Sequence, residues 1–197
     1  DIHKRTAAEI FGVMINDVDD QMRRRAKTIN FGLLYGMSAF GLSNQLEVSR
    51  AEADIFLNNY FERYSAVKSF MSEIIEQAKR DKFVTTLYNR KIHVPNIDAG
   101  NYMMRQGSER AAINGPLQGS AADIIKIAMI HIQNLINNDM QDIKMILQVH
   151  DELIFEVPAD FKDDDIKPVL SIMEETTKIS VPLKVEYGFG ANWREAH

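Results

Sequence analysis

The stretch RRRAKTINFGLLYG, residues 23–36, determines the expected fold of the first part of this chain. Within it, Arg23, Lys27, Phe31 and Tyr35 follow one another at a constant spacing of four. If the stretch is helical, each step advances about 40° around the axis, so these four residues, the outer stripe, span about 120°. Two cations followed by two aromatic rings suit a ligand with a charged polyphosphate at one end and a flat base at the other.

A second stripe, the inner stripe, lies on roughly the opposite side of the same helix and contains Met22, Ala26, Ile29 and Leu33. The helix can therefore pack on the protein with its inner stripe while the outer stripe faces a ligand. The alternative is a basic amphipathic helix whose charged face is only solvated and whose rings are buried in the core. The outer stripe alone leaves both interpretations open.

Composition places the chain among ordinary globular proteins. Its 197 residues predict one or two domains, and its 45% hydrophobic and 26% charged residues are enough to form a core. The absence of cysteine excludes disulfides and thiolate metal sites. No signal peptide and no apolar run of roughly 18 residues is present, so we expect an intracellular location. The chain begins Asp-Ile-His without methionine, and we expect it to be part of a longer protein.

Charge is distributed unevenly along the chain. The net charge is −5, yet residues 139–175 contain 11 acidic residues and 3 lysines and so carry −8. The remainder has 20 basic and 17 acidic residues, a net charge of +3. A protein of negative total charge can still bind a polyanion through a local basic surface. We expect the acidic segment to be a solvated flank, a metal-binding region, or both.

The first part of the chain predicts a series of helices. Helical periodicity of apolar residues extends over residues 4–11, 17–35, 51–64 and 66–81, and residues 37–48 are expected to be a short helical or irregular connection. Asn16 or Asp17 is the expected N-cap of the second helix, and Ser49 with Glu52 predicts a capping box before the helix at 51–64. On that helix we expect core residues at Ala53, Phe56, Tyr60 and Tyr64.

Beyond residue 81 the pattern mixes strands with helices. Strands are predicted at residues 84–87, at 92–94, on both sides of a polar turn in KMILQVHDELIFEV (144–157), and at PLKVEYGFG (182–190). Helices are expected over residues 102–137 and 164–178. Gly115-Pro116 should kink or break the first of them, because proline removes a backbone donor and clashes with the preceding turn. The expected fold class is therefore α+β.

Two further polar clusters point to chemistry, and the first is a ladder on the expected long helix. Gln106, Arg110, Asn114 and Gln118 again have a spacing of four. Arginine pairs with phosphate, and the amide side chains offer donors and acceptors to sugars and base edges. The alternative is an exposed polar helix face, and Pro116 can move Gln118 out of register with Arg110.

The second cluster is His150-Asp151-Glu152 at the expected hairpin turn. A solvated charged turn is the simple alternative. However, the apolar flanks predict buried strands that hold the turn rigidly, and the turn lacks the glycine usual in tight two-residue turns. Adjacent carboxylates on a rigid hairpin suit Mg²⁺, which prefers oxygen ligands and retains waters that phosphate oxygens can replace.

Three long motifs make the chain resemble a known family. In order, RRRAKTINFGLLYG, ERAAINGPLQGSAADIIK and QVHDELIFEV resemble the later motifs of family A DNA polymerases, the bacterial DNA polymerase I group. DIHKRTAAEIFGV, residues 1–13, resembles the stretch that follows the family's first catalytic motif. The resemblance implies a right-hand architecture, in which residues 1–104 form most of the helical fingers and residues 105–197 the C-terminal part of an antiparallel-sheet palm.

The resemblance also implies roles for individual residues. Arg23 and Lys27 are similar to the residues that contact the incoming triphosphate, with His3 assisting, Phe31 near the sugar and Tyr35 near the templating base. The positions around the primer terminus and the minor groove correspond to Arg105, Arg110, Asn114, Gln118 and His150. Asp151, with Glu152 beside it, is similar to the family's metal-binding aspartate.

The implied activity is DNA-templated DNA synthesis in replication and repair. The primer 3′-hydroxyl attacks the α-phosphate of a deoxynucleoside triphosphate, and two Mg²⁺ ions about 4 Å apart activate the nucleophile and stabilise the leaving oxygens. Lys27 is the candidate general acid. Rotation of the fingers helix would bring Arg23 and Lys27 onto the phosphates only when a correct base pair fits against Tyr35.

The sequence departs from the family in lacking the first catalytic motif, the thumb and any proofreading domain. We therefore expect the isolated chain not to polymerise, while its parent does. A non-catalytic DNA-binding relative and a related single-subunit RNA polymerase stay open as alternatives, because the residue that screens the sugar 2′-position is not in the chain. The implied partners are primer-template DNA and deoxynucleoside triphosphates, without a membrane, and the parent is expected to be a cytoplasmic bacterial monomer.

Overall fold

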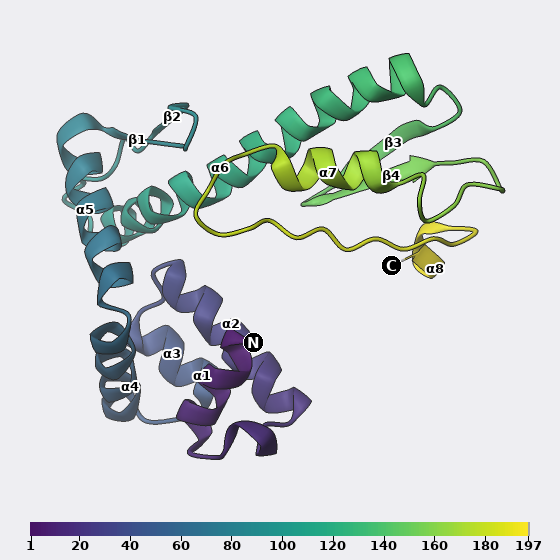
Figure 1. The fold of residues 1–197 in the computed structure, drawn as a ribbon. Helices are drawn as coiled ribbons and strands as arrows, with labels where there is room; N and C mark the ends of the chain where they lie inside the picture. Colours follow the sequence, from purple (N-terminus) through teal and green to yellow (C-terminus); the bar gives the residue numbers. More distant parts are fainter. Residues whose placement is uncertain (197) are drawn as a thin grey trace. The chain divides into compact units, whose positions relative to one another are not determined.

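The computed structural model describes residues 1–196 and is mostly helical, with two small antiparallel sheets (Figure 1). The chain folds into two compact units, Asp1–Leu117 and Gln118–His197. The expected α+β class is confirmed. None of the helices formed by residues 1–196 combines the length and the apolar character that crossing a bilayer requires.

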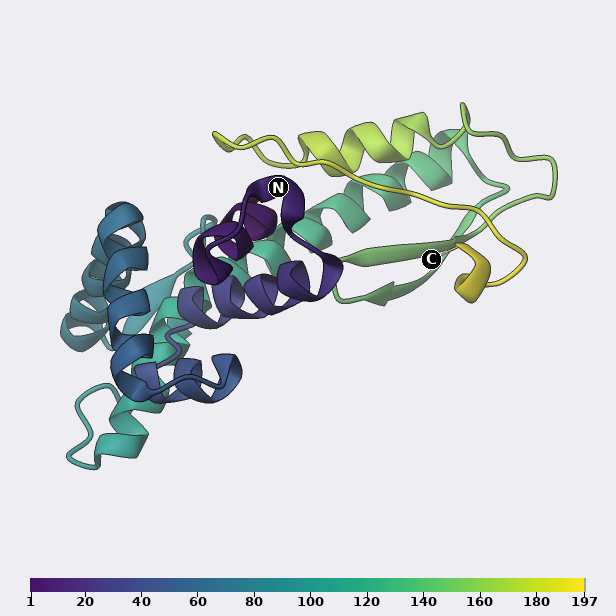
Figure 2. The ribbon, with the colours of Figure 1, turned by 90° about the horizontal axis from the view of Figure 1, so that it is seen from below.

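The first unit is built mainly from helices that follow the expected ranges. In chain order these are α1 (Ile2–Phe11), the 3-10 helix η1 (Ile15–Asp17), α2 (Asp20–Leu34), α3 (Ala39–Leu46), α4 (Arg50–Arg63) and α5 (Ser65–Asp81). Helices α1 and α2 lie side by side (Figures 1 and 2). The predicted hairpin of β1 (Phe83–Thr85) and β2 (Lys91–His93) forms, and the N-terminal part of α6 (Tyr102–Asp139) completes the unit.

Side-chain caps define where these helices begin. The Asp1 carboxylate accepts hydrogen bonds from two backbone N–H groups in the first turn of α1. The capping box of Ser49 and Glu52 at α4 is confirmed, with both reciprocal hydrogen bonds present. The predicted caps of α2 were wrong, because residues 15–17 form the separate turn η1 and Asp19 caps the helix instead.

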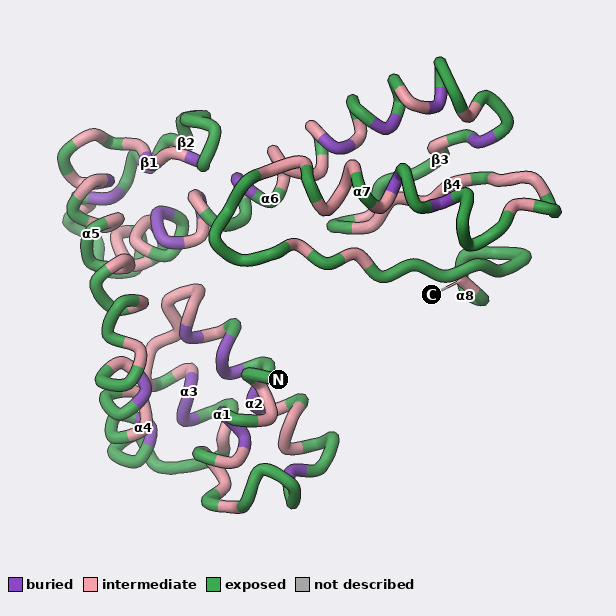
Figure 3. Tube along the Cα trace, viewed as in Figure 1, coloured by how far each residue is buried: buried purple, intermediate pink, exposed green. Residues whose placement is uncertain are grey.

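The core of the first unit confirms the inner stripe. One buried cluster joins α2, α3 and α4 and consists of Ile29, Leu33, Leu42, Ala53 and Tyr60, with Phe56 and Tyr64 packed against it. Ala26, Ile29 and Leu33 have no exposed surface (0%). Met22 packs against a second cluster, between α1 and α2. Figure 3 shows these buried segments on the facing sides of the helices.

Helix α6 runs from Tyr102 to Asp139, so Gly115-Pro116 do not break it, and the expected kink stays a prediction. A proline in a helix interior costs about 3 kcal/mol, and the long helical segments on both sides retain their own hydrogen bonds. Gly115 allows α6 to pack closely against the β1–β2 hairpin. A Cβ there would lie 2.9 Å from Val84 Cγ2 and 3.4 Å from Ile92 Cδ1, so only glycine lets α6 approach the β1–β2 hairpin this closely.

The second unit combines the C-terminal part of α6 with β3 (Lys144–Val149), β4 (Glu152–Glu156), α7 (Lys167–Glu175) and α8 (Trp193–Ala196). The predicted hairpin is confirmed: β3 and β4 pair antiparallel from Lys144 opposite Glu156 to Val149 opposite Glu152. Their core is a cluster of Ala128, Ile132, Ile136, Ile143, Ile166 and Val169.

Three predictions for the second unit were wrong. Helix α7 is shorter than residues 164–178, and it begins near Pro168, which is favourable in a first helical turn. Residues 182–190 are extended but pair with no strand among the described residues, and the Val185 N–H donates to the Glu174 carboxylate instead. Strands β3 and β4 were predicted to be buried, but neither contains a fully buried residue. Ile146 (57% exposed) and Leu147 (48% exposed) lie outside the core cluster.

Candidate functional site

The outer stripe of α2 lies at the surface of the first unit. Lys27 is exposed, Phe31 is 41% exposed, and Arg23 and Tyr35 are half-buried. Because the inner stripe is fixed in the core, the direction of the outer stripe is fixed as well. These four side chains are therefore accessible within their own unit, as the sequence predicts.

The aromatic end of the stripe is a row of three rings. The Phe31 and Tyr35 ring centroids lie 6.2 Å apart with planes inclined by 27°, a stacked arrangement. On the other side of Phe31, the His3 ring centroid lies 5.7 Å from that of Phe31. Partly exposed rings that support one another offer a preorganised apolar surface to a flat ligand or a sugar.

The cationic end of the stripe contains two differently placed charges. Arg23 Nε donates to Asp1 Oδ2 at 2.6 Å, which ties the start of α2 to the start of α1 while its side chain stays 43% exposed. Lys27 lies one turn further along, and no carboxylate among residues 1–196 pairs with it. The lysine is therefore the cation of the stripe that an anionic ligand can take over without displacing a partner.

His3 stands beside both cations and is held from behind by a buried polar network. Its Nδ1 lies 3.0 Å from Asn30 Nδ2, and Asn30 Nδ2 lies 3.0 Å from Thr6 Oγ1. Burial lowers the pKa of His3 from its ordinary value of 6.5, and the neighbouring charges of Arg23 and Lys27 lower this pKa further. The neutral imidazole is therefore the favoured form near pH 7.

Thr6 and Asn30 are site residues that sequence reasoning missed. Both are buried polar residues, 2% and 4% exposed. The available signal was the position of Asn30, which precedes Phe31 and points into an otherwise apolar quadrant of α2. Buried amides and hydroxyls require hydrogen-bond partners, and that requirement indicates a contact with a neighbouring element such as α1.

The polar ladder of α6 meets the end of α2 at Gly36. This glycine has a φ of 77°, and a Cβ on it would lie 3.2 Å from Arg110 Cγ and 3.5 Å from Ile113 Cδ1. The structure thus brings Arg110, a predicted DNA contact, against the segment that follows Tyr35. The sequence alone did not connect these two motifs.

The other ladder residues have varied surroundings. Arg105 Nη1 donates to the Ala99 carbonyl at 3.1 Å, and its guanidinium lies 5.7 Å from the centroid of the Tyr102 ring. Asn114 has a buried Oδ1 that accepts no hydrogen bond from residues 1–196. Gln118 lies in the second unit and is exposed. Their predicted DNA contacts stay predictions.

The hairpin turn of the second unit is tighter than expected. His150 and Asp151 alone connect β3 to β4, while Glu152 is already the first residue of β4. His150 takes a φ of 52°, which replaces the glycine usual in such turns, and its carbonyl accepts a hydrogen bond from Gln148 Nε2. A non-glycine residue in this region is strained and often belongs to a functional site.

The metal-binding capacity of this turn is limited. Asp151 is exposed, and its carboxylate and that of Glu152 are adjacent in sequence, which is a suitable oxygen donor set for Mg²⁺. Among residues 1–196, however, no group of three His, Cys, Asp or Glu side chains lies close enough to hold a metal ion. The pair fits a shared site that takes further ligands from elsewhere.

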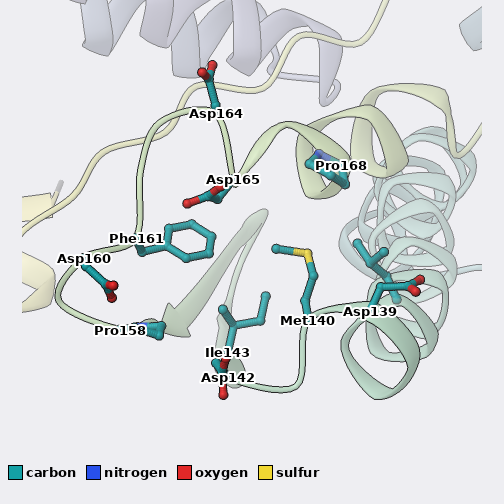
Figure 4. A pocket seen from close by; sticks show the side chains of 11 residues that line it. Asp139, Met140, Asp142, Ile143, Pro158, Asp160, Phe161, Asp164, Asp165 and Pro168 are labelled. Atoms are coloured by element: carbon teal, nitrogen blue, oxygen red, sulfur yellow. The ribbon is translucent and has the colours of Figure 1, made fainter.

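The acidic segment 139–175 surrounds a hollow of about 540 Å³ in the second unit (Figure 4). Met140, Ile143 and Phe161 point into its centre, so its floor is apolar. The carboxylates lie at the rim, and that of Asp164 pairs with Lys167 at 2.5 Å. The carboxylates that line the hollow therefore indicate a solvated flank, whereas Asp151 and Glu152 of the same segment do not line it.

Comparison with known proteins gives a consistent result over the whole length. The family model described as DNA polymerase family A matches residues 1–195. The chain is 47% identical to DNA polymerase I of Pseudomonas aeruginosa, covering 100% of this chain and 22% of that protein, and 43% identical to DNA polymerase I of Bacillus caldotenax with the same coverage. The chain thus spans about a fifth of these relatives.

A solved structure is similar to the complete chain. It is the POL domain of Pol1 from M. smegmatis, solved as a complex with DNA primer-template and dNTP. The TM-score is 0.93 at 39% identity, with coverage of 100% of this chain and 35% of that one. At this identity the likeness extends to the arrangement of the helices and strands described above.

Proposed function

This chain belongs to DNA polymerase family A, and from that premise we propose that the protein containing it carries out DNA-templated DNA synthesis. The proposed reaction joins a deoxynucleoside triphosphate to a primer 3′-hydroxyl and releases pyrophosphate. The observation that carries the proposal is the outer stripe of α2. It presents Lys27, which no carboxylate of residues 1–196 neutralises, one helical turn from the accessible Phe31–Tyr35 ring pair.

Within this proposal the outer stripe binds the incoming nucleotide. Arg23 and Lys27 offer charge-assisted hydrogen bonds to phosphate oxygens, and Lys27 also supplies a proton to the leaving pyrophosphate. His3 adds a neutral donor beside them. Phe31 packs against the sugar, and Tyr35 supports the nascent base pair. In this proposal the two cations bind the phosphate end of the nucleotide, and the two rings contact its sugar and base.

Primer-template DNA is the second proposed ligand. The similar M. smegmatis structure was solved with DNA primer-template and dNTP, which supports the same ligands here. We assign residues 1–104 to the fingers and residues 105–197 to the palm. The DNA-contacting residues in this assignment are Arg105, Arg110, Asn114, Gln118 and His150. The packing of Arg110 against Gly36 supports a link between the DNA contact and the nucleotide end of α2.

Asp151 and Glu152 are the proposed ligands of Mg²⁺ within this chain. When bound, the ions would lower the pKa of the attacking hydroxyl and neutralise charge on the phosphate oxygens. Residues 1–196 offer no group of three possible metal ligands. We therefore propose that the 197-residue chain alone does not extend a primer, and that the complete protein does.

The test compares the complete polymerase with the 197-residue chain in primer extension at saturating Mg²⁺ and deoxynucleotides. We expect extension by the complete protein only. Extension by the isolated chain contradicts the proposed incompleteness of its metal site. A complete protein that binds primer-template without extending it is the non-catalytic relative, and one that prefers ribonucleotides is an RNA polymerase. Either of these results overturns the proposed activity.

A further inference from the structure

The hydrogen bonds behind His3 determine which of its ring nitrogens carries the proton. The Thr6 hydroxyl lies 2.9 Å from the Ile2 carbonyl and 3.2 Å from Asn30 Oδ1, and the shorter contact, to Ile2, takes its single hydrogen and leaves its oxygen as an acceptor. Asn30 Nδ2 lies 3.0 Å from that oxygen and 3.0 Å from His3 Nδ1. The amide group has two hydrogens, and these two acceptors use both of them.

This arrangement leaves His3 Nδ1 as an acceptor. In a neutral imidazole one nitrogen accepts and the other donates, so the proton must be on Nε2. With Asn30 Nδ2 facing the ring, the opposite tautomer would place two N–H groups against each other. Because Asn30 is 4% exposed and Thr6 is 2% exposed, water does not compete for these bonds, and the network selects one tautomer.

We propose that Asn30 is a positioning residue, which together with Thr6 fixes His3 as the tautomer with a protonated Nε2 and directs that N–H toward the triphosphate. The inference rests on the proposed function, since it assumes that a nucleotide binds at the outer stripe. It assigns a role to a buried amide on the inner side of α2 that does not itself touch the ligand.

The charges around His3 fit this role. Arg23 and Lys27 on α2 lie near the ring and disfavour imidazolium, while Asp1 is occupied by Arg23 and by the backbone of α1. A histidine kept neutral can still donate one oriented hydrogen bond to a phosphate oxygen. It then does so without adding a third positive charge beside the two cations.

The experiment is a double-mutant cycle on the nucleotide KM of the complete polymerase. Asn30→Leu removes the amide at similar size, and His3→Ala removes the ring. Each single variant should raise the nucleotide KM about 5- to 10-fold, as expected for one lost hydrogen bond, with a smaller change in kcat. The double variant should be no worse than His3→Ala, because Asn30 acts only through His3.

Thr6 supplies the matched pair of variants. Thr6→Ser keeps the hydroxyl and should have a nucleotide KM near that of the wild type, whereas Thr6→Val keeps the shape without the acceptor and should raise it. If the effects of Asn30→Leu and His3→Ala multiply, or if Thr6→Ser is as impaired as Thr6→Val, the network is only structural and the inference is wrong. Unfolding midpoints measured in urea identify any variant that is merely destabilised.

The result for His3→Ala separates this inference from the proposed function. If His3→Ala leaves the nucleotide KM unchanged while Lys27→Ala raises it, the nucleotide site stands and the role of Asn30 is refuted. If both variants behave like the wild type, the proposed nucleotide site itself is wrong, and the inference fails with it.

Discussion

Substitution of Lys27 is the most informative perturbation of the proposed nucleotide site. The lysine lies in the middle of the outer stripe, is exposed, and has no carboxylate partner among residues 1–196, so its removal leaves no unpaired acid behind. The loss of activity should therefore report the interaction with the ligand rather than a disturbed fold. This separates Lys27 from Arg23, whose guanidinium also ties α2 to Asp1.

The expected magnitude follows from the contact that is lost. A hydrogen bond to a charged group contributes about 1.5 to 3 kcal/mol, so Lys27→Ala should lower kcat/KM about 10- to 150-fold. If Lys27 is also the general acid, kcat should fall by a further factor of about 10² to 10⁴. Lys27→Arg separates the phosphate contact from the general-acid role, because arginine keeps the charge but does not release its proton near neutral pH.

The assay is single-turnover extension by the complete polymerase over a range of deoxynucleotide concentrations, which separates nucleotide binding from the chemical step. Lys68→Ala is the matched control, since Lys68 is an exposed lysine on α5 of the same unit, outside the outer stripe. We expect the control to behave like the wild type. Wild-type kinetics of Lys27→Ala would refute the phosphate role of the stripe.

Three further results are expected. Gly36→Ala should destabilise the protein by about 1 to 2 kcal/mol in urea unfolding, because the φ of 77° at this position is unfavourable for alanine and the new Cβ would press on Arg110. Gly107→Ala is the control and should not destabilise the protein, because the space around Gly107 is open. Equal unfolding midpoints for the two variants would contradict this prediction. Asp151→Ala should abolish primer extension while the unfolding midpoint and DNA binding are retained, and loss of folding would instead favour a structural role for the turn. The folded-state pKa of His3 lies below 6.5, so the contribution of this residue to stability is complete above pH 6.5 and is lost as the pH falls toward the lowered pKa. The wild type should therefore lose free energy of unfolding more steeply than His3→Gln between pH 7 and 5. Parallel curves for the two proteins would exclude the pKa shift.

Periodicity predicted the elements of the first unit well because α2 has two distinct faces. Ala26, Ile29 and Leu33 are apolar at helical spacing, and burial of this inner stripe decides the direction of the outer one. The capping box at Ser49 could also be predicted from the sequence, because it depends only on two residues three positions apart. Local signals of this kind need no knowledge of distant partners.

The errors arose where a distant contact decides the outcome. Residues 182–190 have the composition of a strand, but a strand requires a neighbouring strand, and none pairs with them among the described residues. The proline at 116 was expected to kink or break a helix, yet α6 continues through it without a break. In both cases the local preference was read correctly, and the surrounding structure determined whether it was realised.

The candidate site was predictable in part. The spacing of Lys27 and Phe31 predicted the stripe that is exposed on α2, whereas the support of His3 by Thr6 and Asn30 depends on how α1 lies against α2. The contact between Gly36 and Arg110 likewise joins segments that are far apart in the sequence. Hydrogen-bond partners across elements have no periodic signature, so they emerge only from the folded structure.

The most direct test of the proposed nucleotide site is a crystal structure of the complete polymerase with a chain-terminated primer-template, Mg²⁺ and the next correct deoxynucleoside triphosphate. The proposal predicts the triphosphate within hydrogen-bond distance of Lys27 and Arg23, the His3 Nε2 facing a phosphate oxygen, and the sugar and base beside Phe31 and Tyr35. A triphosphate bound away from α2, with Lys27 in solvent, would contradict it.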